Sequence, residues 1–174
     1  MKTLYLMRHA KSDWSLSGGS DHDRVLTARG EADAGKMSLY LQQTDIRPDV
    51  VLCSSAKRTC QTLSLMDAAG FKHGDTSIVD TLYLASPTVL SSLIRSQSDA
   101  VRSLLVIAHN PGLHELAVAL AHGGATTDLQ TLNRKYPAGS MAELAFDTTS
   151  WANFDAHRGH LQRFIRPKAL LDRQ

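Results

Sequence analysis

Arginine and histidine side chains follow three apolar segments of strand length in this chain. Arg8 and His9 come directly after the first segment, Arg58 follows the second after a short turn, and His109 directly follows the third. The apolar segments are residues 4–7, 50–53 and 104–108. Because ligands of an open α/β sheet collect where its strands end, these four side chains are expected to meet at one rim. Guanidinium groups bind anions and imidazole acts as a nucleophile or acid–base group, so the pattern predicts such chemistry on an anionic substrate.

The order of the elements predicts how this rim is built. Strand-like and helix-like segments alternate along the chain, without repeats or linker-like stretches, as in βαβ units. We expect one domain over residues 1–174, a three-layer α/β/α sandwich with a mostly parallel central sheet. Residues 141–146 and 160–165 alternate in polarity and predict a hairpin that completes the sheet. Trp151 and Phe154, in the polar loop between them, are expected to cover the core.

Local signals predict where three helices begin. Thr27 is expected to cap a helix that ends near Gln43, with Ala32 and Leu39 on its inner face. Pro87 is expected to start a helix that runs to about residue 96. A third helix is predicted after His109, with the cap at 110, proline at the first helical position 111, and an end at the glycines 123 and 124.

Composition excludes several classes of function. The chain has 174 residues, of which 43% are hydrophobic and 21% charged, and a formal net charge of +2. No apolar stretch approaches the roughly 20 residues that cross a bilayer, and the N-terminus lacks a signal-like segment, so we expect a cytoplasmic protein with no membrane partner. The scattered basic residues predict no nucleic-acid partner. The densest basic cluster is interpreted as a solvated terminal strand and tail; it comprises Arg163, Arg166, Lys168 and Arg173.

Neither the cysteines nor the remaining histidines form a metal-binding pattern. Cys53 and Cys60 are interpreted as buried thiols, because their spacing matches neither paired CxxC motifs nor a disulfide framework. No H-E-x-x-H or similar motif is present, so no metal and no cofactor are predicted. Four histidines are expected to face solvent: His22, His73, His157 and His160.

Several motifs resemble those of the histidine phosphatase superfamily, also called the phosphoglycerate mutase-like superfamily. The Arg8-His9 turn, the segment 54–62 with Arg58, and the late His109 match its motifs in order and spacing. Further segments are similar to the small bacterial branch of SixA-type phosphohistidine phosphatases. They are Arg8-His9-Ala10-Lys11-Ser12-x-Trp14, Asp23-Arg24-x-Leu26-Thr27-x-x-Gly30, Leu82-Tyr83-x-Ala85-Ser86-Pro87 and His109-Asn110-Pro111-Gly112. The resemblance covers essentially the whole chain.

This resemblance implies a role for each core residue. His9 would attack phosphorus through a neutral imidazole nitrogen and form a phosphohistidine intermediate that water hydrolyses. Arg8, Arg58 and His109 would supply positive charge to the transferring phosphoryl group. The two arginines would favour the neutral imidazole, because like charges disfavour imidazolium. Ser15 and Asn110 are expected to contact the substrate.

The chain departs from the family pattern at the general acid. Members that act on alcohol phosphates place a glutamate soon after the first histidine or in the middle segment, where this chain has Lys11 and residues 82–85. Asp13 and Asp80 could replace the missing glutamate only because they lie near these positions in the sequence. A positioned acid accelerates the departure of an alkoxide leaving group by roughly 10²–10⁴-fold, whereas imidazole can depart already protonated. The absence of a general acid therefore favours cleavage of a P–N bond over hydrolysis of a phosphate ester.

Short connections favour the same substrate. Residues 80–104 have room for one helix and no large cap, so an open pocket would admit a phosphohistidine on a protein surface. The alternatives are a phosphatase of small phosphate monoesters, a phosphohistidine-binding module without turnover and, with less support, a phosphoglycerate-type mutase. A phosphohistidine-containing protein is therefore the favoured partner, with a small phosphorylated molecule as the second possibility.

Overall fold

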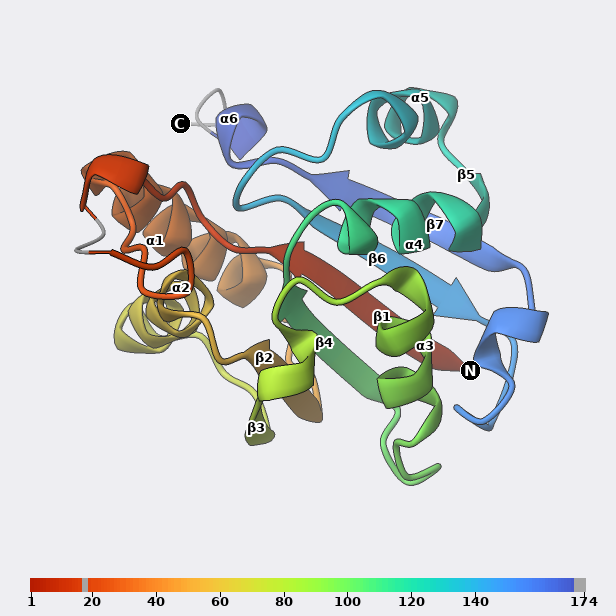
Figure 1. Cartoon of the computed structure of the whole chain (residues 1–174). Coiled ribbons are helices and arrows are strands. Elements are labelled where there is room, and N and C mark those ends of the chain that lie inside the picture. The colour runs from red at the N-terminus through yellow and green to blue at the C-terminus, as the bar shows by residue number, and fades with distance from the viewer. Residues whose placement is uncertain (17–18, 171–174) are drawn as a thin grey trace.

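A computed structural model describes residues 1–16 and 19–170, which form a seven-stranded sheet between two layers of helices (Figure 1). The strand order is β3-β2-β4-β1-β6-β7-β5. Four of the neighbouring pairs are parallel, and β6 is antiparallel to both β1 and β7. The strands are β1 (Lys2–Arg8), β2 (Val50–Ser54), β3 (Asp75–Val79), β4 (Ser103–Ala108), β5 (Ala121–Gly124), β6 (Met141–Phe146) and β7 (Gly159–Ile165). This is the predicted α/β class with a mostly parallel sheet.

The helices cover both faces of the sheet. They are α1 (Ala28–Gln43), α2 (Lys57–Ala68), α3 (Pro87–Arg95), α4 (Gly112–Leu120), α5 (Thr126–Arg134) and α6 (Pro167–Leu170). Helices α1 and α2 pack against one apolar cluster, and α3, α4 and α5 pack against the other. The three-layer arrangement predicted from the alternation of elements is confirmed.

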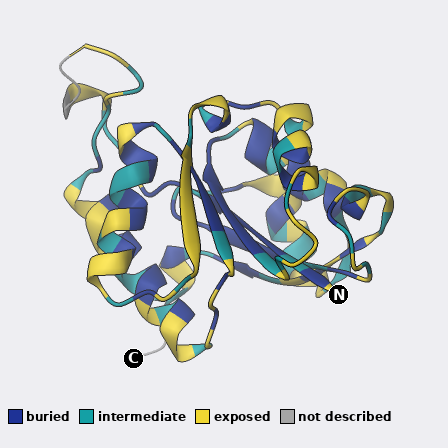
Figure 2. Ribbon diagram, turned by 90° about the horizontal axis from the view of Figure 1, so that it is seen from below, coloured by how far each residue is buried: buried dark blue, intermediate teal, exposed yellow. Residues whose placement is uncertain are grey.

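Alternation along the central strands divides the core between the two faces. Leu4 and Leu6 of β1 lie in the cluster under α3 and α4, whereas Tyr5 and Met7 lie in the cluster under α1 and α2. Successive side chains of a strand point to opposite faces, so a strand covered on both sides is apolar throughout. Figure 2 shows these central strands buried between helices whose outer sides are exposed. The buried strands form a rigid support for the residues at their ends.

The first two predicted helix starts are confirmed. Thr27 precedes α1, and its side chain accepts a hydrogen bond from the backbone N–H of Gly30. Helix α3 begins at Pro87 and ends one residue before the predicted end. The inner face of α1 was predicted wrongly, because Ala32 and Leu39 are exposed. The buried positions of α1 are Gly30, Asp33, Ala34, Met37, Ser38 and Leu41.

The third helix differs from its prediction at both ends. Pro111 is the cap residue of α4 and Gly112 its first residue, so Asn110 lies outside the helix. The Asn110 amide instead donates a hydrogen bond to the carbonyl oxygen of Tyr136 at 3.0 Å. Helix α4 ends at Leu120, and the glycines expected to end it lie in β5, which pairs with β7. A strand partner at the sheet edge therefore replaces the last turn of the predicted helix.

The predicted hairpin and its aromatic cover are confirmed. Strands β6 and β7 pair antiparallel, and Trp151 and Phe154 in their connection are fully buried. Cys53 is buried as expected, whereas Cys60 is only half-buried. None of the described helices is long and apolar enough to cross a membrane.

Candidate active site

The parallel register of β1 and β4 brings His9 and His109 together. Arg8 pairs with Ala108, so the residues that follow them, His9 and His109, lie side by side at the ends of the two strands. The two imidazole rings lie 5.3 Å apart between centroids, and both residues are almost completely buried. The structure thus brings together two residues that are 100 positions apart in the sequence, at the carboxyl edge where they were predicted to meet.

Arg58 joins the two histidines from the start of the neighbouring helix. It is the second residue of α2, which follows β2 after a short turn, and it is 2% exposed. Its Nε–H donates to His9 Nε2 at 3.2 Å, and its Nη2–H donates to His109 Nδ1 at 3.2 Å. Because a guanidinium group only donates hydrogen bonds, both contacted imidazole nitrogens carry lone pairs.

These contacts determine the tautomer of His9. Its Nε2 accepts from Arg58, so the proton is on Nδ1, which donates to the carbonyl oxygen of Ala10 at 2.7 Å. The hydrogen bond to Ala10 also fixes the orientation of the ring. The lone pair of Nε2 therefore lies on the side of the ring that faces Arg58, which is the form a nucleophilic imidazole requires.

His109 has the opposite tautomer. Its Nδ1 accepts from Arg58, and its Nε2–H donates to Ser54 Oγ at 2.7 Å. Ser54 is the last residue of β2 and is completely buried. The end of β2 thus orients the His109 ring, a contact that the sequence analysis did not predict.

Arg8, the residue before His9, has one unused side-chain donor. Its Nη1–H donates to the carbonyl oxygen of Tyr136 at 3.0 Å, and its buried Nε has no hydrogen-bond partner among the described residues. Asn110 also donates to that carbonyl, and no described group pairs with its buried Oδ1. Asn110 therefore lies beside Arg8, and its contact with the substrate stays a prediction. Unsatisfied buried donors are uncommon, and a phosphate oxygen would satisfy the Nε–H of Arg8.

The turn that carries His9 is held by backbone contacts from three segments. Ala10 N–H donates to Thr62 Oγ1 at 3.0 Å, Gly139 N–H donates to the His9 carbonyl at 2.8 Å, and His9 N–H donates to the Ala108 carbonyl at 3.3 Å. Gly30 of α1 packs so tightly here that a Cβ would lie 2.1 Å from the Lys11 carbonyl oxygen. Any larger residue at position 30 would displace the turn.

Burial keeps both histidines neutral. It lowers the pKa of His9 to about 3, with smaller lowering contributions from His109, Arg58 and Arg8. Burial also lowers the pKa of His109 to about 3, with Arg58 as the next cause. The arginines were predicted to keep His9 neutral, but desolvation is the larger cause. The positive charge predicted for His109 during phosphoryl transfer would require a bound dianion to raise this pKa.

Stability is expected to depend on pH through these two groups. Because their folded pKa values lie below the unfolded value, stability is complete above pH 6.5 and falls as the pH drops toward about 3. When the pH is lowered from 7 to 4.5, the free energy of unfolding should therefore fall by about 2 kcal/mol less in His9→Ala than in the unmodified protein. Urea denaturation at both pH values measures the difference, with His109→Ala as a second variant. Parallel losses in all three proteins would contradict the depressed pKa values.

Asp21 and Tyr83 belong to the site but were not assigned a role from the sequence. Arg58 Nη1–H donates to the Asp21 carbonyl at 2.7 Å, and its Nη2 lies 3.2 Å from Asp21 Oδ2. The Tyr83 hydroxyl donates to the same carboxylate oxygen, and its ring stands edge-on to His109 at 5.5 Å between centroids. Tyr83 stood in a motif that resembled the family, but Asp21 precedes the motif that begins at Asp23 and gave no other signal.

The Asp21 carboxyl group is ionised in this environment. Burial alone would raise its pKa, but the hydrogen bond from Tyr83 and the charge of Arg58 outweigh burial, and the pKa lies below its ordinary value. A carboxylate that stays ionised cannot protonate a leaving group. Asp21 therefore positions Arg58 and does not replace the missing general acid.

The two carboxylates named as substitutes make no described contact with His9 or His109. Hydrogen bonds from Ser15 lower the pKa of half-buried Asp13, and Asp80 is exposed in the short helical turn after β3. Ser15 is exposed, and its described contact is with Asp13 and not with the four core residues. His22 was expected to face solvent, and its side chain is 41% exposed; its ring also packs edge-on against Tyr83, and its Nε2 lies 3.1 Å from Ser55 Oγ.

No cluster of three or more metal-ligating side chains occurs within residues 1–16 and 19–170. The two histidines at the site instead contact Arg58, whose charge disfavours a bound cation. The arrangement suits an oxyanion that approaches Arg8 and the lone pair of His9 Nε2.

Solved structures with the same architecture are phosphoglycerate mutase-like proteins. The chain superposes on a candidate phosphohistidine phosphatase SixA from Nakamurella multipartitia with a TM-score of 0.83 at 28% identity, covering 95% of this chain and 96% of that one. A second candidate SixA, from Agrobacterium tumefaciens, gives a TM-score of 0.78 at 29% identity, covering 95% and 99%. The fold is thus that of the phosphoglycerate mutase-like histidine phosphatases.

Sequence comparison agrees with the structural likeness. A model of the histidine phosphatase superfamily (branch 1) matches residues 4–77. An uncharacterised Mycobacterium tuberculosis protein is 33% identical over 166 residues, covering 93% of this chain and all of that protein. The chain belongs to the histidine phosphatase superfamily, whose members are phosphatases or mutases.

Proposed function

We propose that this protein is a phosphatase that removes the phosphoryl group from phosphohistidine on a protein. One observation carries the proposal: a neutral histidine, His9, accepts a hydrogen bond from Arg58, and the Asp21 carboxylate that contacts Arg58 is ionised. His9 can therefore attack phosphorus, but no described carboxyl group contacts Arg58 in a form that could protonate an alkoxide. The likeness to two candidate SixA structures supports the same substrate class.

The proposed reaction has two steps. His9 Nε2 attacks phosphorus, the bond between phosphorus and the substrate nitrogen breaks, and the substrate imidazole leaves with its proton already bound. Water then attacks the phosphorus of phospho-His9 and releases inorganic phosphate and His9. Arg8 and Arg58 donate hydrogen bonds to the phosphoryl oxygens, and His109 becomes a cation as the dianion raises its pKa.

Rates should depend steeply on the leaving group. We expect phosphate release from a phosphohistidine-bearing protein and from aryl phosphates to exceed release from alkyl phosphates by about 10²–10⁴-fold in kcat/KM, because no described carboxyl group protonates a poor leaving group. Neither Asp13→Asn nor Asp80→Asn should change the phosphohistidine rate by more than about twofold. Phosphate release measured across this substrate series, with the wild type and both variants, tests the proposal.

The same series separates the alternatives. A flat dependence on leaving group that either aspartate variant makes steep would show that the chain has a general acid and acts on small monoesters. Under single-turnover conditions, binding of the phosphoprotein without release of phosphate would show that the protein is a binding module. Either outcome overturns the proposed function.

A further inference from the structure

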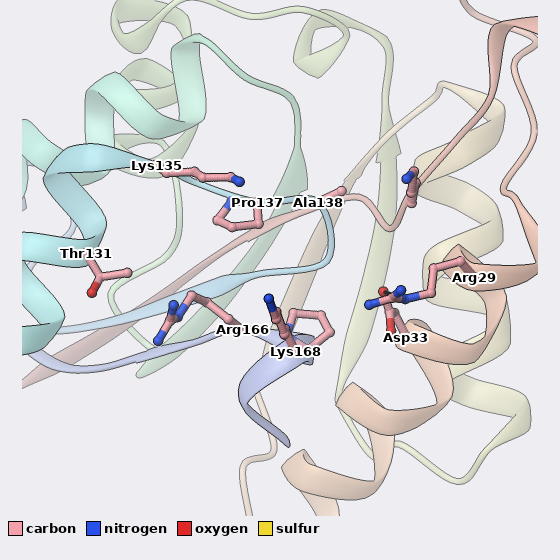
Figure 3. A pocket seen from close by; sticks show the side chains of 10 residues that line it. Arg29, Asp33, Thr131, Lys135, Pro137, Ala138, Arg166 and Lys168 are labelled. Carbon is pink, nitrogen blue, oxygen red and sulfur yellow. Dashed lines mark ion pairs between the residues drawn. The ribbon is translucent and has the colours of Figure 1, made fainter. Parts of the chain in front are cut away.

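A hollow lies at the carboxyl rim of the sheet, lined by residues that follow β1 and β7. Its volume is about 430 Å³, within the range of pockets that hold small molecules. Five cationic side chains and one carboxylate line it (Figure 3): Lys11, Arg29, Lys135, Arg166, Lys168 and Asp33. We call Arg8, His9, Arg58 and His109 the phosphate site. None of these four residues lines the hollow.

Four segments bring these cations together. Lys11 follows β1, Arg29 is in the first turn of α1, Lys135 follows α5, and Arg166 and Lys168 follow β7. Because β7 is antiparallel to β6, and β6 is antiparallel to β1, β7 ends at the same rim as β1. In Figure 3 the side chains of Lys168 and Arg29 point into the space beside Pro137. Arg166 and Lys168 belong to the cluster that was interpreted as a solvated terminal strand and tail, and Lys168 is exposed as expected; Arg173 lies outside the described residues.

The positive charge of the hollow is largely uncompensated. Asp33 is already engaged, since its carboxylate lies 3.5 Å from Arg29 and 3.6 Å from Lys36. Lys11, Lys135, Arg166 and Lys168 make no ion pair with a carboxylate of the described residues, and the buried Nε of Arg166 has no hydrogen-bond partner there. Like charges gathered around a concave surface repel one another and concentrate anions.

The wall of the hollow also belongs to the phosphate site. Pro137 and Ala138 line the hollow, while the neighbouring Tyr136 carbonyl accepts a hydrogen bond from Arg8 at 3.0 Å. Gly139, one residue further, donates to the carbonyl of His9 at 2.8 Å. A ligand in the hollow would therefore rest against the segment that holds Arg8 and His9.

We propose that this hollow binds a compact phosphate-type polyanion with two or more phosphate or phosphonate groups. Ammonium groups act as point charges without the planar fork that matches one phosphate, so three lysines and two arginines spread over several segments suit more than one anionic group. The apolar surface of Pro137 and Pro167 can contact an uncharged part of the ligand. This site is separate from the four core residues and does not depend on the proposed function.

Titration calorimetry with methylenediphosphonate, which phosphatases do not hydrolyse, tests the site. Charge reversal by Lys135→Glu with Arg166→Glu should weaken binding by at least about 30-fold, because two charge-assisted contacts become repulsive. The matched control is Arg47→Glu with Lys72→Glu beside a different hollow of about 230 Å³, and it should change affinity by less than about threefold. Arg58→Ala, which disrupts the phosphate site, should leave this affinity equally unchanged.

A measurement on the unmodified protein covers the case in which the double variant does not fold. In an NMR titration with methylenediphosphonate, the amide resonances of Lys135 and Ala138 should shift. The shifts should saturate at the same probe concentration as the calorimetric heat. Unchanged binding by a folded double variant, or loss of binding in Arg58→Ala, would overturn the proposal and place the anion elsewhere. The absence of both heat and resonance shifts at millimolar probe would overturn it as well.

Discussion

His9→Ala is expected to reduce phosphate release by at least about 10⁴-fold, because the proposed covalent step has no other nucleophile. Two contacts of His9 favour this role. Its Nδ1–H is held by the Ala10 carbonyl, and its Nε2 lone pair faces Arg58. Initial rates with a phosphohistidine-bearing protein and with an aryl phosphate measure the loss.

Two checks accompany the His9 variant. His122→Ala, at an exposed histidine in β5, should retain full activity, and the far-UV circular dichroism of both variants should match the unmodified protein. The two variants then separate loss of the nucleophile from loss of a histidine in general. A folded His9→Ala protein with activity within tenfold of the wild type would remove His9 from the nucleophilic role.

Arg58→Lys is expected to lower kcat/KM by about 10²–10³-fold even though the charge is kept. The guanidinium group spans His9, His109 and Asp21 with separate nitrogen atoms. A single ammonium group cannot reach all three positions, so the two imidazole rings and the bound phosphate would lose their common partner. Steady-state kinetics on an aryl phosphate measures the change.

The matched control replaces a surface arginine in the same way. Arg47 is exposed and pairs with Asp45 at 2.7 Å, so Arg47→Lys should leave kcat/KM within about twofold. If Arg58→Lys were as silent as this control, the phosphate would be held by other groups, and the buried contacts of Arg58 would be structural only.

Much of the site geometry could be predicted because it follows from strand order. The ends of β1, β2 and β4 lie side by side, and the residues after them therefore converge whatever the details of packing. The position of Arg58 in the first turn of α2 follows from the short β2–α2 connection. The roles of these four residues stay predictions until the variants are measured.

Contacts that depend on tertiary packing could not be predicted from the sequence. Asp21 and Tyr83 are 62 positions apart, and only the folded chain brings the Tyr83 hydroxyl to the Asp21 carboxylate oxygen that Arg58 also contacts. Helix α5 was also missed, because Leu129 and Leu132 are its only apolar residues and Leu132 alone is fully buried.

The inner face of α1 shows why periodicity misled the sequence analysis. The buried side of α1 includes the polar residues Asp33 and Ser38, which a search for apolar positions does not select. The hydroxyl of Ser38 donates to the Met66 carbonyl at 2.8 Å, and Asp33 pairs with Arg29 and Lys36. Polar residues that find such partners can be buried at little cost, and this compensation is invisible before the packing is known.

The contact between Arg58 and His9 also predicts an order of events in catalysis. The Nε–H of Arg58 occupies the lone pair of His9 Nε2. Attack on phosphorus requires that this lone pair be released. An incoming phosphoryl oxygen is a charged acceptor and competes well with a neutral imidazole for the Nε–H of Arg58, so substrate binding itself would free the nucleophile.

The most direct test of the proposed mechanism is rapid quenching of the reaction with substrate radiolabelled in the phosphoryl group. We expect a phosphoenzyme that is stable in alkali and labile in acid, as an N-phosphorylated imidazole is, with the label mapped to the peptide that contains His9. The His9→Ala protein should take up no label under the same conditions. Turnover without a trapped intermediate, or label on any residue other than His9, would contradict the covalent mechanism.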